Sequence, residues 1–144
     1  MQLKKIPLAD TKSFSQFFLD YIQQKESLKP FYNRFPELKN FKEQITDKSK
    51  NFPSQYREVL VSVLQKQYKS ITAPDAVKKN IAALSDSKTF TVTTGHQLNI
   101  FTGPLYFIYK IVTVINACKK LKETFPDYSF VPVYWMASED HDYD

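Results

Sequence analysis

Two short stretches of this chain contain residue types that can bind anions or transfer protons. They read Gly95-His96-Gln97 and Glu139-Asp140-His141-Asp142, and together they hold both histidines of the sequence. A histidine can act as a general acid or base near neutral pH, donate a hydrogen bond to a phosphate, or bind a metal ion together with carboxylates. For a metal, the sequence supplies only a His-x-Asp spacing and neighbouring carboxylates, which do not define a coordination geometry. We therefore assign no metal ligand and leave a metal requirement open.

Both glycines of the chain border the segment between the first stretch and a long apolar run. Gly95 follows a β-like run, and Gly103 precedes Pro104, a residue well suited to the first position of a helix. A strand, a loop and a helix N-terminus in this order can hold a phosphate or a carboxylate through backbone amides. The alternative is a tight connection that needs glycine for its geometry alone. Neither the P-loop spacing nor the G-x-G-x-x-G spacing is present.

The elements that must position these residues are two strands and a helix. Residues 89–94 and 130–135 are rich in β-branched and aromatic side chains, which predicts strands, although Pro132 indicates an edge position or a local irregularity. Residues 105–121 are apolar on nearly every face, which predicts a helix buried on more than one side. Strand, helix and strand at this spacing predict parallel strands with a right-handed crossover. Both strands then end at the edge where open α/β sheets bind ligands, so the two stretches should line one cleft.

The rest of the chain predicts an all-helical region, which makes the fold class α/β. We expect residues 1–88 to form a helical region that packs on the core, and residues 89–144 to form the first βαβ unit. Apolar residues recur at helical spacing along most of residues 1–88. Ser13 followed by Gln16 predicts a capping box at the start of the first long helix.

Composition and charge narrow the function classes. The chain is 42% hydrophobic and 15% aromatic, which is typical of a globular protein with a core, and its net charge is +5. Residues 1–88 hold 16 basic and 9 acidic residues, a balance that can mark an anionic partner. No run of consecutive basic residues exceeds two, which favours lysines on solvated helix faces. A single cysteine excludes an internal disulfide and fits a reducing cytoplasm, and the first ten residues lack the apolar stretch of a signal peptide.

Two side chains within residues 105–121 need their own interpretation. Lys110 lies two turns inside this apolar helix, where it either reaches the surface or neutralises a buried carboxylate. The alternative is that its ammonium reaches an anion at the start of the helix. The charge of Lys110 also argues against a membrane span. Cys118 lies far from the glycine-bordered loop, and we expect it in the core.

In these segments the sequence resembles the bacillithiol biosynthesis cysteine-adding enzymes, the BshC family. The matching residues are Gly95-His96-Gln97, Thr102-Gly103-Pro104-Leu105-Tyr106, Lys110 and Pro132-Val133-Tyr134-Trp135, followed by Glu139-Asp140-His141-Asp142. The resemblance implies a Rossmann-like nucleotide-binding core with a coiled-coil arm, in a cytoplasmic ligase that forms homodimers and uses neither membrane nor nucleic acid. Family members are several times longer than this chain. We therefore expect an N-terminal fragment that does not catalyse alone.

The resemblance also implies the reaction and the roles of the site residues. Cysteine would be added to glucosaminyl-malate in the last step of bacillithiol biosynthesis. Amide ligation needs an activated carboxylate, so ATP or ADP is the expected nucleotide, and the sequence does not choose between phosphorylation and adenylation. The implied catalytic residues are His96, Asp140 and His141. The implied nucleotide- and substrate-binding residues are Gly95, Gln97, Asn99, Gly103, Lys110, Glu139 and Asp142. The alternatives are a non-catalytic nucleotide- or anion-binding α/β module and a basic helical domain that binds a partner.

Overall fold

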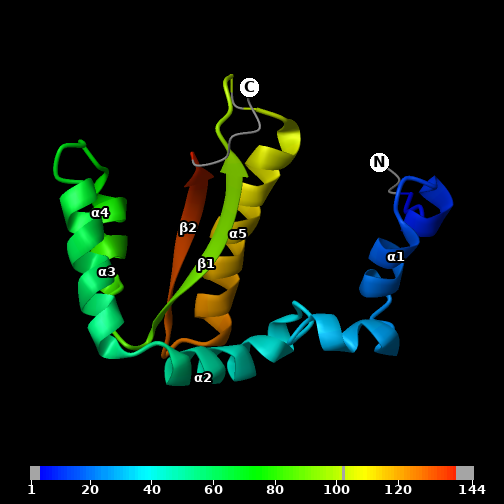
Figure 1. The fold of residues 1–144 in the computed structure, drawn as a ribbon, viewed down its shortest axis with the longest axis horizontal. Helices are drawn as coiled ribbons and strands as arrows, with labels where there is room; N and C mark the ends of the chain where they lie inside the picture. The colour runs from blue at the N-terminus through cyan, green and yellow to red at the C-terminus, as the bar shows by residue number, and fades with distance from the viewer. Residues whose placement is uncertain (1–3, 102, 139–144) are drawn as a thin grey trace. The chain divides into compact units, whose positions relative to one another are not determined.

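The computed structural model describes residues 4–101 and 103–138, and its contacts divide the chain into two units, Met1–Phe41 and Lys42–Asp144 (Figure 1). The first unit consists of short helical segments: the 3-10 helices η1 (Leu8–Thr11), η2 (Glu26–Phe31) and η3 (Leu38–Asn40), and the α-helix α1 (Gln16–Ile22). The predicted capping box at Ser13 is wrong. Ser15 is the residue that caps α1, and its hydroxyl accepts a hydrogen bond from the Phe18 amide at 3.2 Å.

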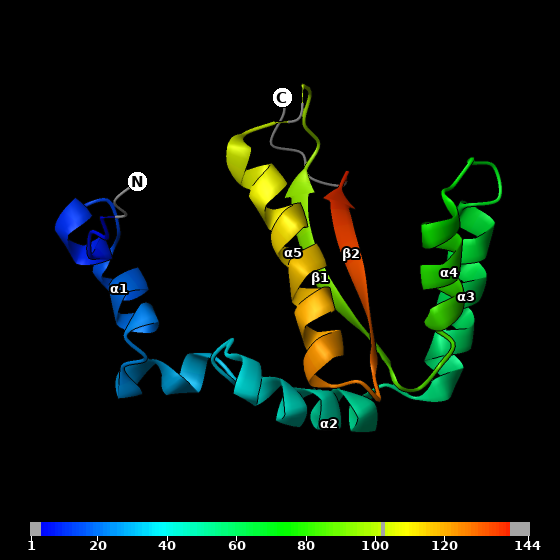
Figure 2. The ribbon, with the colours of Figure 1, turned by 180° about the vertical axis from the view of Figure 1, so that it is seen from behind.

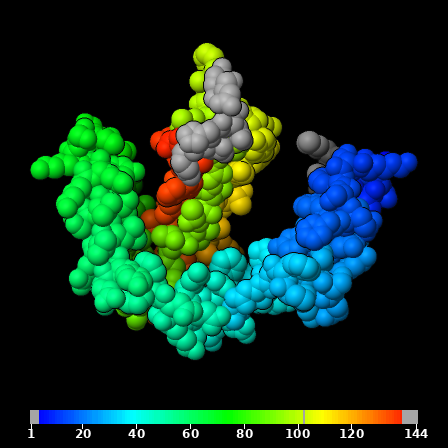
Figure 3. Space-filling view, in the orientation of Figure 1, coloured from blue at the N-terminus to red at the C-terminus, as the bar shows by residue number. Residues whose placement is uncertain are grey.

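The second unit contains three helices followed by a βαβ unit. The helices are α2 (Phe41–Asn51), α3 (Ser54–Gln67) and α4 (Asp75–Ala83). A proline directly precedes both α3 and α4 as the N-cap residue. Its ring disfavours a helical backbone at the residue before it, so each helix begins after the proline. Figures 1 and 2 show α3 and α4 side by side, and their side chains form one continuous surface in Figure 3. Among the helices described, none combines the length and hydropathy needed to cross a membrane.

The βαβ unit consists of β1 (Thr89–Gln97), α5 (Leu105–Thr124) and β2 (Ser129–Ala137). The two strands are parallel, as predicted, and they pair from Thr89 with Ser129 to Gln97 with Ala137. Both strands extend further toward their carboxyl ends than the sequence predicts. Pro132 pairs opposite Val92, and it is accommodated because, within the described residues, β2 has a strand neighbour on one side only.

Gly95 lies inside β1 and not after it, which corrects the predicted end of the strand. Its pairing partner is Trp135, and a Cβ atom added to Gly95 would lie 2.9 Å from the Trp135 carbonyl oxygen. Glycine is therefore needed here for a close approach between the strands. The pairing of the two strands continues beyond this position, through His96 to Gln97.

One face of α5 packs on the sheet (Figures 1 and 2), and this contact forms the centre of the core. The buried side chains there are Val114, Cys118, Leu121 and Val131. Burial raises the pKa of the Cys118 thiol, although a hydrogen bond with the Val92 backbone opposes this, so its predicted place in the core is confirmed. The predicted burial of α5 on more than one side is wrong. Leu105, Tyr109 and Val112 remain exposed, because the two strands that the structure describes cover only one face of the helix.

Arg57 of α3 is a buried cation that connects three segments of the second unit. Only 6% of the residue is exposed. Its Nη1 donates to the carbonyl oxygens of Leu84 at 3.1 Å and Thr89 at 2.9 Å, and its Nη2 donates to that of Ser87 at 3.3 Å. The Phe90 ring lies 5.9 Å from the guanidinium carbon. Arg57 therefore fixes α3 to the connection between α4 and β1.

We predict that Arg57→Met lowers the free energy of unfolding by about 2–4 kcal/mol, because buried carbonyl groups lose a charged donor. Chemical denaturation of the chain measures this change. Lys66→Met is the matched control, since Lys66 is an exposed cation of the same helix, and we expect a change within about 0.5 kcal/mol. A loss at Arg57 no larger than that of the control would contradict the prediction.

Candidate functional site

The candidate site lies at the carboxyl end of β1, around the loop that leads into α5 (Figure 1). Thr102 in this loop is outside the described residues. Glu139, Asp140, His141 and Asp142 also lie outside them, so their predicted place in the site stays a prediction. β2 ends at Ala137 opposite Gln97. The chain therefore leaves both strands at the same edge of the sheet, as the parallel arrangement predicts.

The His96 ring is half-buried, and both of its nitrogens have hydrogen-bonding partners. Nε2 lies 2.5 Å from the Tyr106 hydroxyl. Nδ1 lies 3.1 Å from the Asn99 side-chain nitrogen and 3.2 Å from the Gln97 carbonyl oxygen. The Tyr106 ring lies against the imidazole with its centroid 5.1 Å away, and the Phe107 ring meets it edge-on at 6.0 Å. The first turn of α5 thus holds this ring in place.

The backbone of His96 is held from the neighbouring strand. The Tyr134 hydroxyl of β2 donates to the His96 carbonyl oxygen at 3.3 Å. The Tyr134 ring packs edge-on against Phe107, with the centroids 5.4 Å apart. An aromatic pair between β2 and α5 therefore supports the strand end that carries His96.

The loop after β1 has a left-handed backbone at two positions. Phe101 has φ +50° and Gly103 has φ +61°, and the Gly103 amide donates to the Ile100 carbonyl oxygen at 3.0 Å. A Cβ atom on Gly103 would lie 2.8 Å from Cγ of Asn99. Gly103 thus leaves room for the Asn99 side chain. Pro104 is the N-cap residue and not the first helical residue, which corrects the prediction by one position.

Lys110 connects α5 to β1. Its Nζ donates to the Gly95 carbonyl oxygen at 3.0 Å, and it lies 5.4 Å from the centroid of the Tyr106 ring. Of the two structural alternatives for Lys110, the described residues fit the one in which the side chain reaches the surface, and they supply no buried carboxylate as its partner. The ammonium remains exposed and still has donors that the Gly95 carbonyl does not use.

Six of the site residues that we predicted come together at this strand end: Gly95, His96, Gln97, Asn99, Gly103 and Lys110. The sequence interpretation missed Tyr106 and Tyr134, which hold the side chain and the backbone of His96. Both tyrosines lie in the segments that carry the family resemblance, but the sequence analysis assigned neither of them a role in the site. A tyrosine two residues after a Gly-Pro pair was the one local signal, because it places the ring on the first helical turn beside the loop.

Chemically, the arrangement is a set of hydrogen-bond donors with one positive charge. Among the described residues, no three His, Cys, Asp or Glu side chains lie close enough together to hold a metal ion. The phenol of Tyr106 and the ammonium of Lys110 suit a carboxylate or a phosphate, while both nitrogens of His96 are engaged within the site. The backbone amides at the start of α5 have the same preference.

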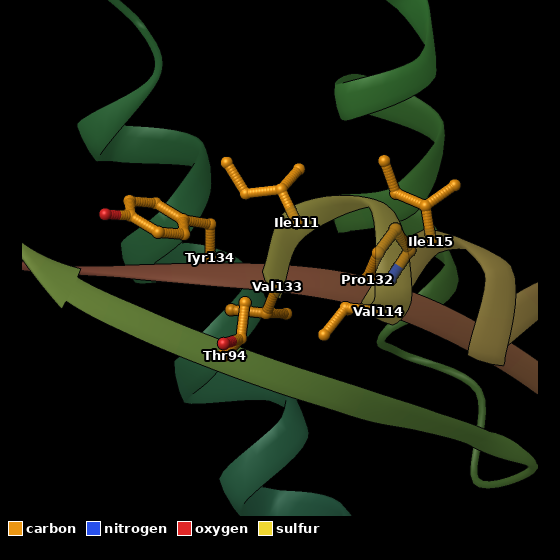
Figure 4. A pocket seen from close by; sticks show the side chains of 7 residues that line it. All are labelled: Thr94, Ile111, Val114, Ile115, Pro132, Val133 and Tyr134. Atoms are coloured by element: carbon orange, nitrogen blue, oxygen red, sulfur yellow. The ribbon is translucent and has the colours of Figure 1, made fainter. Parts of the chain in front are cut away.

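An apolar hollow of about 170 Å³ lies beside this site, between α5 and the sheet (Figure 4). Its lining consists of Thr94, Ile111, Val114, Ile115, Pro132, Val133 and Tyr134. Most of these side chains are hydrocarbon, so the hollow does not suit an anion. The polar groups of the candidate site therefore lie at the strand end and in the loop, outside this hollow.

We predict that Gly103→Ala destabilises the chain by at least about 1–2 kcal/mol, the cost of a left-handed backbone for a residue with a Cβ atom. The new methyl group also displaces Asn99 and moves the NMR signals of the His96 ring. The double variant Gly103→Ala/Asn99→Gly should recover the part that is due to the clash but not the backbone cost, because the Cβ atom of Asn99 would also lie only 2.9 Å from the added atom. A double-mutant cycle by chemical denaturation separates the two. A fully additive cycle would show that the two residues do not meet.

Comparison with known proteins agrees with this fold. The family described as "Bacillithiol biosynthesis BshC, N-terminal Rossmann-like domain" matches residues 1–144. Three relatives carry the name "Putative cysteine ligase BshC". The protein from Flavobacterium psychrophilum is 54% identical over 132 residues, which cover 91% of this chain and 25% of the relative. The protein from Flavobacterium johnsoniae is 54% identical over 131 residues, with the same two shares. That from Christiangramia forsetii is 51% identical over 139 residues, which cover 96% of this chain and 26% of the relative.

The chain spans about a quarter of the length of these relatives. The match includes all of the elements described above, from the N-terminal helices to the parallel strands. It confirms the α/β fold class with a helical N-terminal region and a Rossmann-like parallel sheet. This chain belongs to the BshC family of bacillithiol biosynthesis, and it corresponds to the N-terminal Rossmann-like domain of that family.

Proposed function

We propose that the complete protein containing this chain is an ATP-dependent ligase that adds L-cysteine to glucosaminyl-malate, the last step of bacillithiol biosynthesis. The observation that supports this most directly is the donor cluster of His96, Tyr106 and Lys110 at the carboxyl end of β1. Ligands of open α/β sheets bind at this edge. The names of the relatives supply the reaction class, since they are called cysteine ligases.

Amide formation by this route needs two steps. A carboxylate oxygen attacks ATP and forms an acyl phosphate with release of ADP, or an acyl adenylate with release of pyrophosphate. The amine then attacks the acyl carbon, phosphate or AMP leaves, and the amine gives up a proton. The nucleotide thus supplies the leaving group, and the protein must bind anions, hold the two reactants together and accept a proton.

In this proposal the described residues divide these tasks. Lys110 and the amides at the start of α5 bind the anionic groups. His96 and Tyr106 provide the polar contact at the reacting end. Gly95, Gln97, Asn99 and Gly103 set the shape of the strand end and the loop. Glu139, Asp140, His141 and Asp142 complete the site from the segment that follows β2.

A non-catalytic nucleotide- or anion-binding module is the second candidate. One specific observation favours it. Both nitrogens of His96 are engaged within the site, so the ring has no free lone pair for a substrate proton. This module would bind ATP or phosphate without turnover in the complete protein.

We predict that the complete open reading frame containing this sequence, when expressed and purified, makes bacillithiol from cysteine, glucosaminyl-malate and ATP. Mass spectrometry identifies the thiol, and nucleotide analysis distinguishes ADP from AMP as the co-product. His96→Ala should lower kcat/KM by at least about 100-fold, the usual size of a lost acid–base or polar contact in the reaction.

The matched control is Lys119→Met, which removes an exposed charge near the far end of α5 and should leave kcat/KM unchanged. Nucleotide binding without any bacillithiol would favour the module over the ligase. Ligase activity that survives His96→Ala would remove His96 from the reaction.

A further inference from the structure

We propose that Tyr106 donates the hydrogen bond to the bound ligand, and that Asn99 and His96 are positioning residues that set the direction of this proton. The inference rests on the proposed function, because the ligand in question is the anionic substrate or nucleotide of the ligase site. It differs from the role expected for His96, which was to exchange a proton with the substrate itself.

The orientation of the Asn99 amide follows from its partner. Its side-chain nitrogen lies 2.9 Å from the Gln97 carbonyl oxygen, and a carbonyl oxygen can only accept a hydrogen bond. The nitrogen, and not the oxygen, must therefore face Gln97. The same nitrogen lies 3.1 Å from Nδ1 of His96, to which it presents its second hydrogen.

A donor facing Nδ1 requires that Nδ1 carries no proton. In the neutral imidazole the proton then lies on Nε2. The opposite tautomer would point the Nδ1 hydrogen toward the Asn99 donor. Its Nδ1–H would also compete for the Gln97 carbonyl oxygen, which lies 3.2 Å from Nδ1 and already accepts a shorter hydrogen bond of 2.9 Å from Asn99. The Nε2–H tautomer is therefore the one that satisfies all of these contacts.

This tautomer determines what the Tyr106 hydroxyl can do. Nε2–H donates to the phenol oxygen, so the hydroxyl hydrogen must point away from His96. Tyr106 is 52% exposed, and this hydrogen is available to a molecule bound at the strand end. Asn99, His96 and Tyr106 thus form a chain of donors that ends in one oriented O–H group.

The charge beside Tyr106 indicates which acceptor this group suits. The Lys110 ammonium lies 5.4 Å from the centroid of the Tyr106 ring. Lys110 is exposed one turn further along α5, on the same face of the helix as Tyr106. A positive charge next to an oriented hydroxyl favours an anionic oxygen, since charge-assisted hydrogen bonds are about twice as strong as neutral ones. The acceptor is therefore an oxygen of a carboxylate or of a phosphate.

The first test determines the tautomer of His96, and this measurement does not require enzymatic activity. Long-range proton–nitrogen NMR of the complete protein that contains this chain distinguishes a protonated Nε2 from a protonated Nδ1. Comparison with the His96→Gln variant identifies the His96 signals. We expect a protonated Nε2 and an unprotonated Nδ1 at a pH where the ring is neutral. A protonated Nδ1 would overturn the proposal even if the complete protein proves to be a cysteine ligase.

The second test uses Asn99→Asp, which replaces the donor by an acceptor of the same shape. The carboxylate should move the proton of the neutral ring to Nδ1. Nε2 then accepts from Tyr106, and the hydroxyl hydrogen is no longer available to the ligand. NMR of the variant verifies this reversal and identifies the pH at which the ring is neutral.

In the complete protein at that pH, Asn99→Asp and Tyr106→Phe should each lower kcat/KM by about 10- to 100-fold, the effect of one lost charge-assisted hydrogen bond. The double variant should be no worse than either single variant, because both changes remove the same contact. The substrate whose KM rises shows whether the accepting oxygen belongs to the nucleotide phosphate or to a carboxylate.

Tyr109→Phe is the matched control, since it removes a hydroxyl from an exposed tyrosine of the same helix, and it should leave the kinetics unchanged. Unchanged kcat/KM in Tyr106→Phe, or full additivity in the double variant, would overturn the proposal. A complete protein without ligase activity would instead reject the proposed function, while the NMR result would still decide the tautomer.

Discussion

The close approach of β1 and β2 at Gly95 and Trp135 is the constraint on which the site depends. A Cβ atom at position 95 would lie 2.9 Å from the Trp135 carbonyl oxygen, so a larger residue would force the two backbones to shift here. With glycine at this position, the strands stay paired past the β-branched part of β1 to Gln97. The same backbone then offers the Gly95 carbonyl to Lys110 and the His96 carbonyl to Tyr134. One small residue thus allows α5 and β2 to hold the strand end from two sides.

In the loop after β1, a glycine again makes room for a neighbouring group. The left-handed backbone at Gly103 leaves space for the Asn99 side chain, which turns back to the Gln97 carbonyl oxygen and to the His96 ring. The two glycines therefore act through what they allow to come close. Both glycines are required for their backbone geometry alone, which is the alternative to anion binding that the sequence left open. Neither of them needs to bind an anion through its own amide. In the proposed function, anion binding is assigned instead to side chains and to the start of α5.

The sequence was sufficient to predict the order and direction of the elements, because the hydrophobic period changes at Thr89 and the apolar run of α5 separates two β-rich segments. The end of β1 could not be predicted in this way. Gly95, His96 and Gln97 have no strong β preference, and they are extended only because β2 lies beside them. Arg57 was missed for a related reason. Its position on an amphipathic helix does not reveal the three carbonyl groups that it meets in a connection about thirty residues later.

A histidine can play several chemical roles, and its hydrogen-bonding partners determine which of these roles is possible. A free ring at the end of β1 would be an acid–base candidate, as the sequence suggests. The described ring has a donor on one nitrogen and a phenol oxygen on the other, so any proton that it exchanges must pass through a rearrangement of Asn99 or Tyr106. In the proposed function, the contribution of His96 is then a property of the three residues together. This is why a substitution at Asn99, which changes no acidic or basic group of the original site, is expected to matter as much as one at Tyr106.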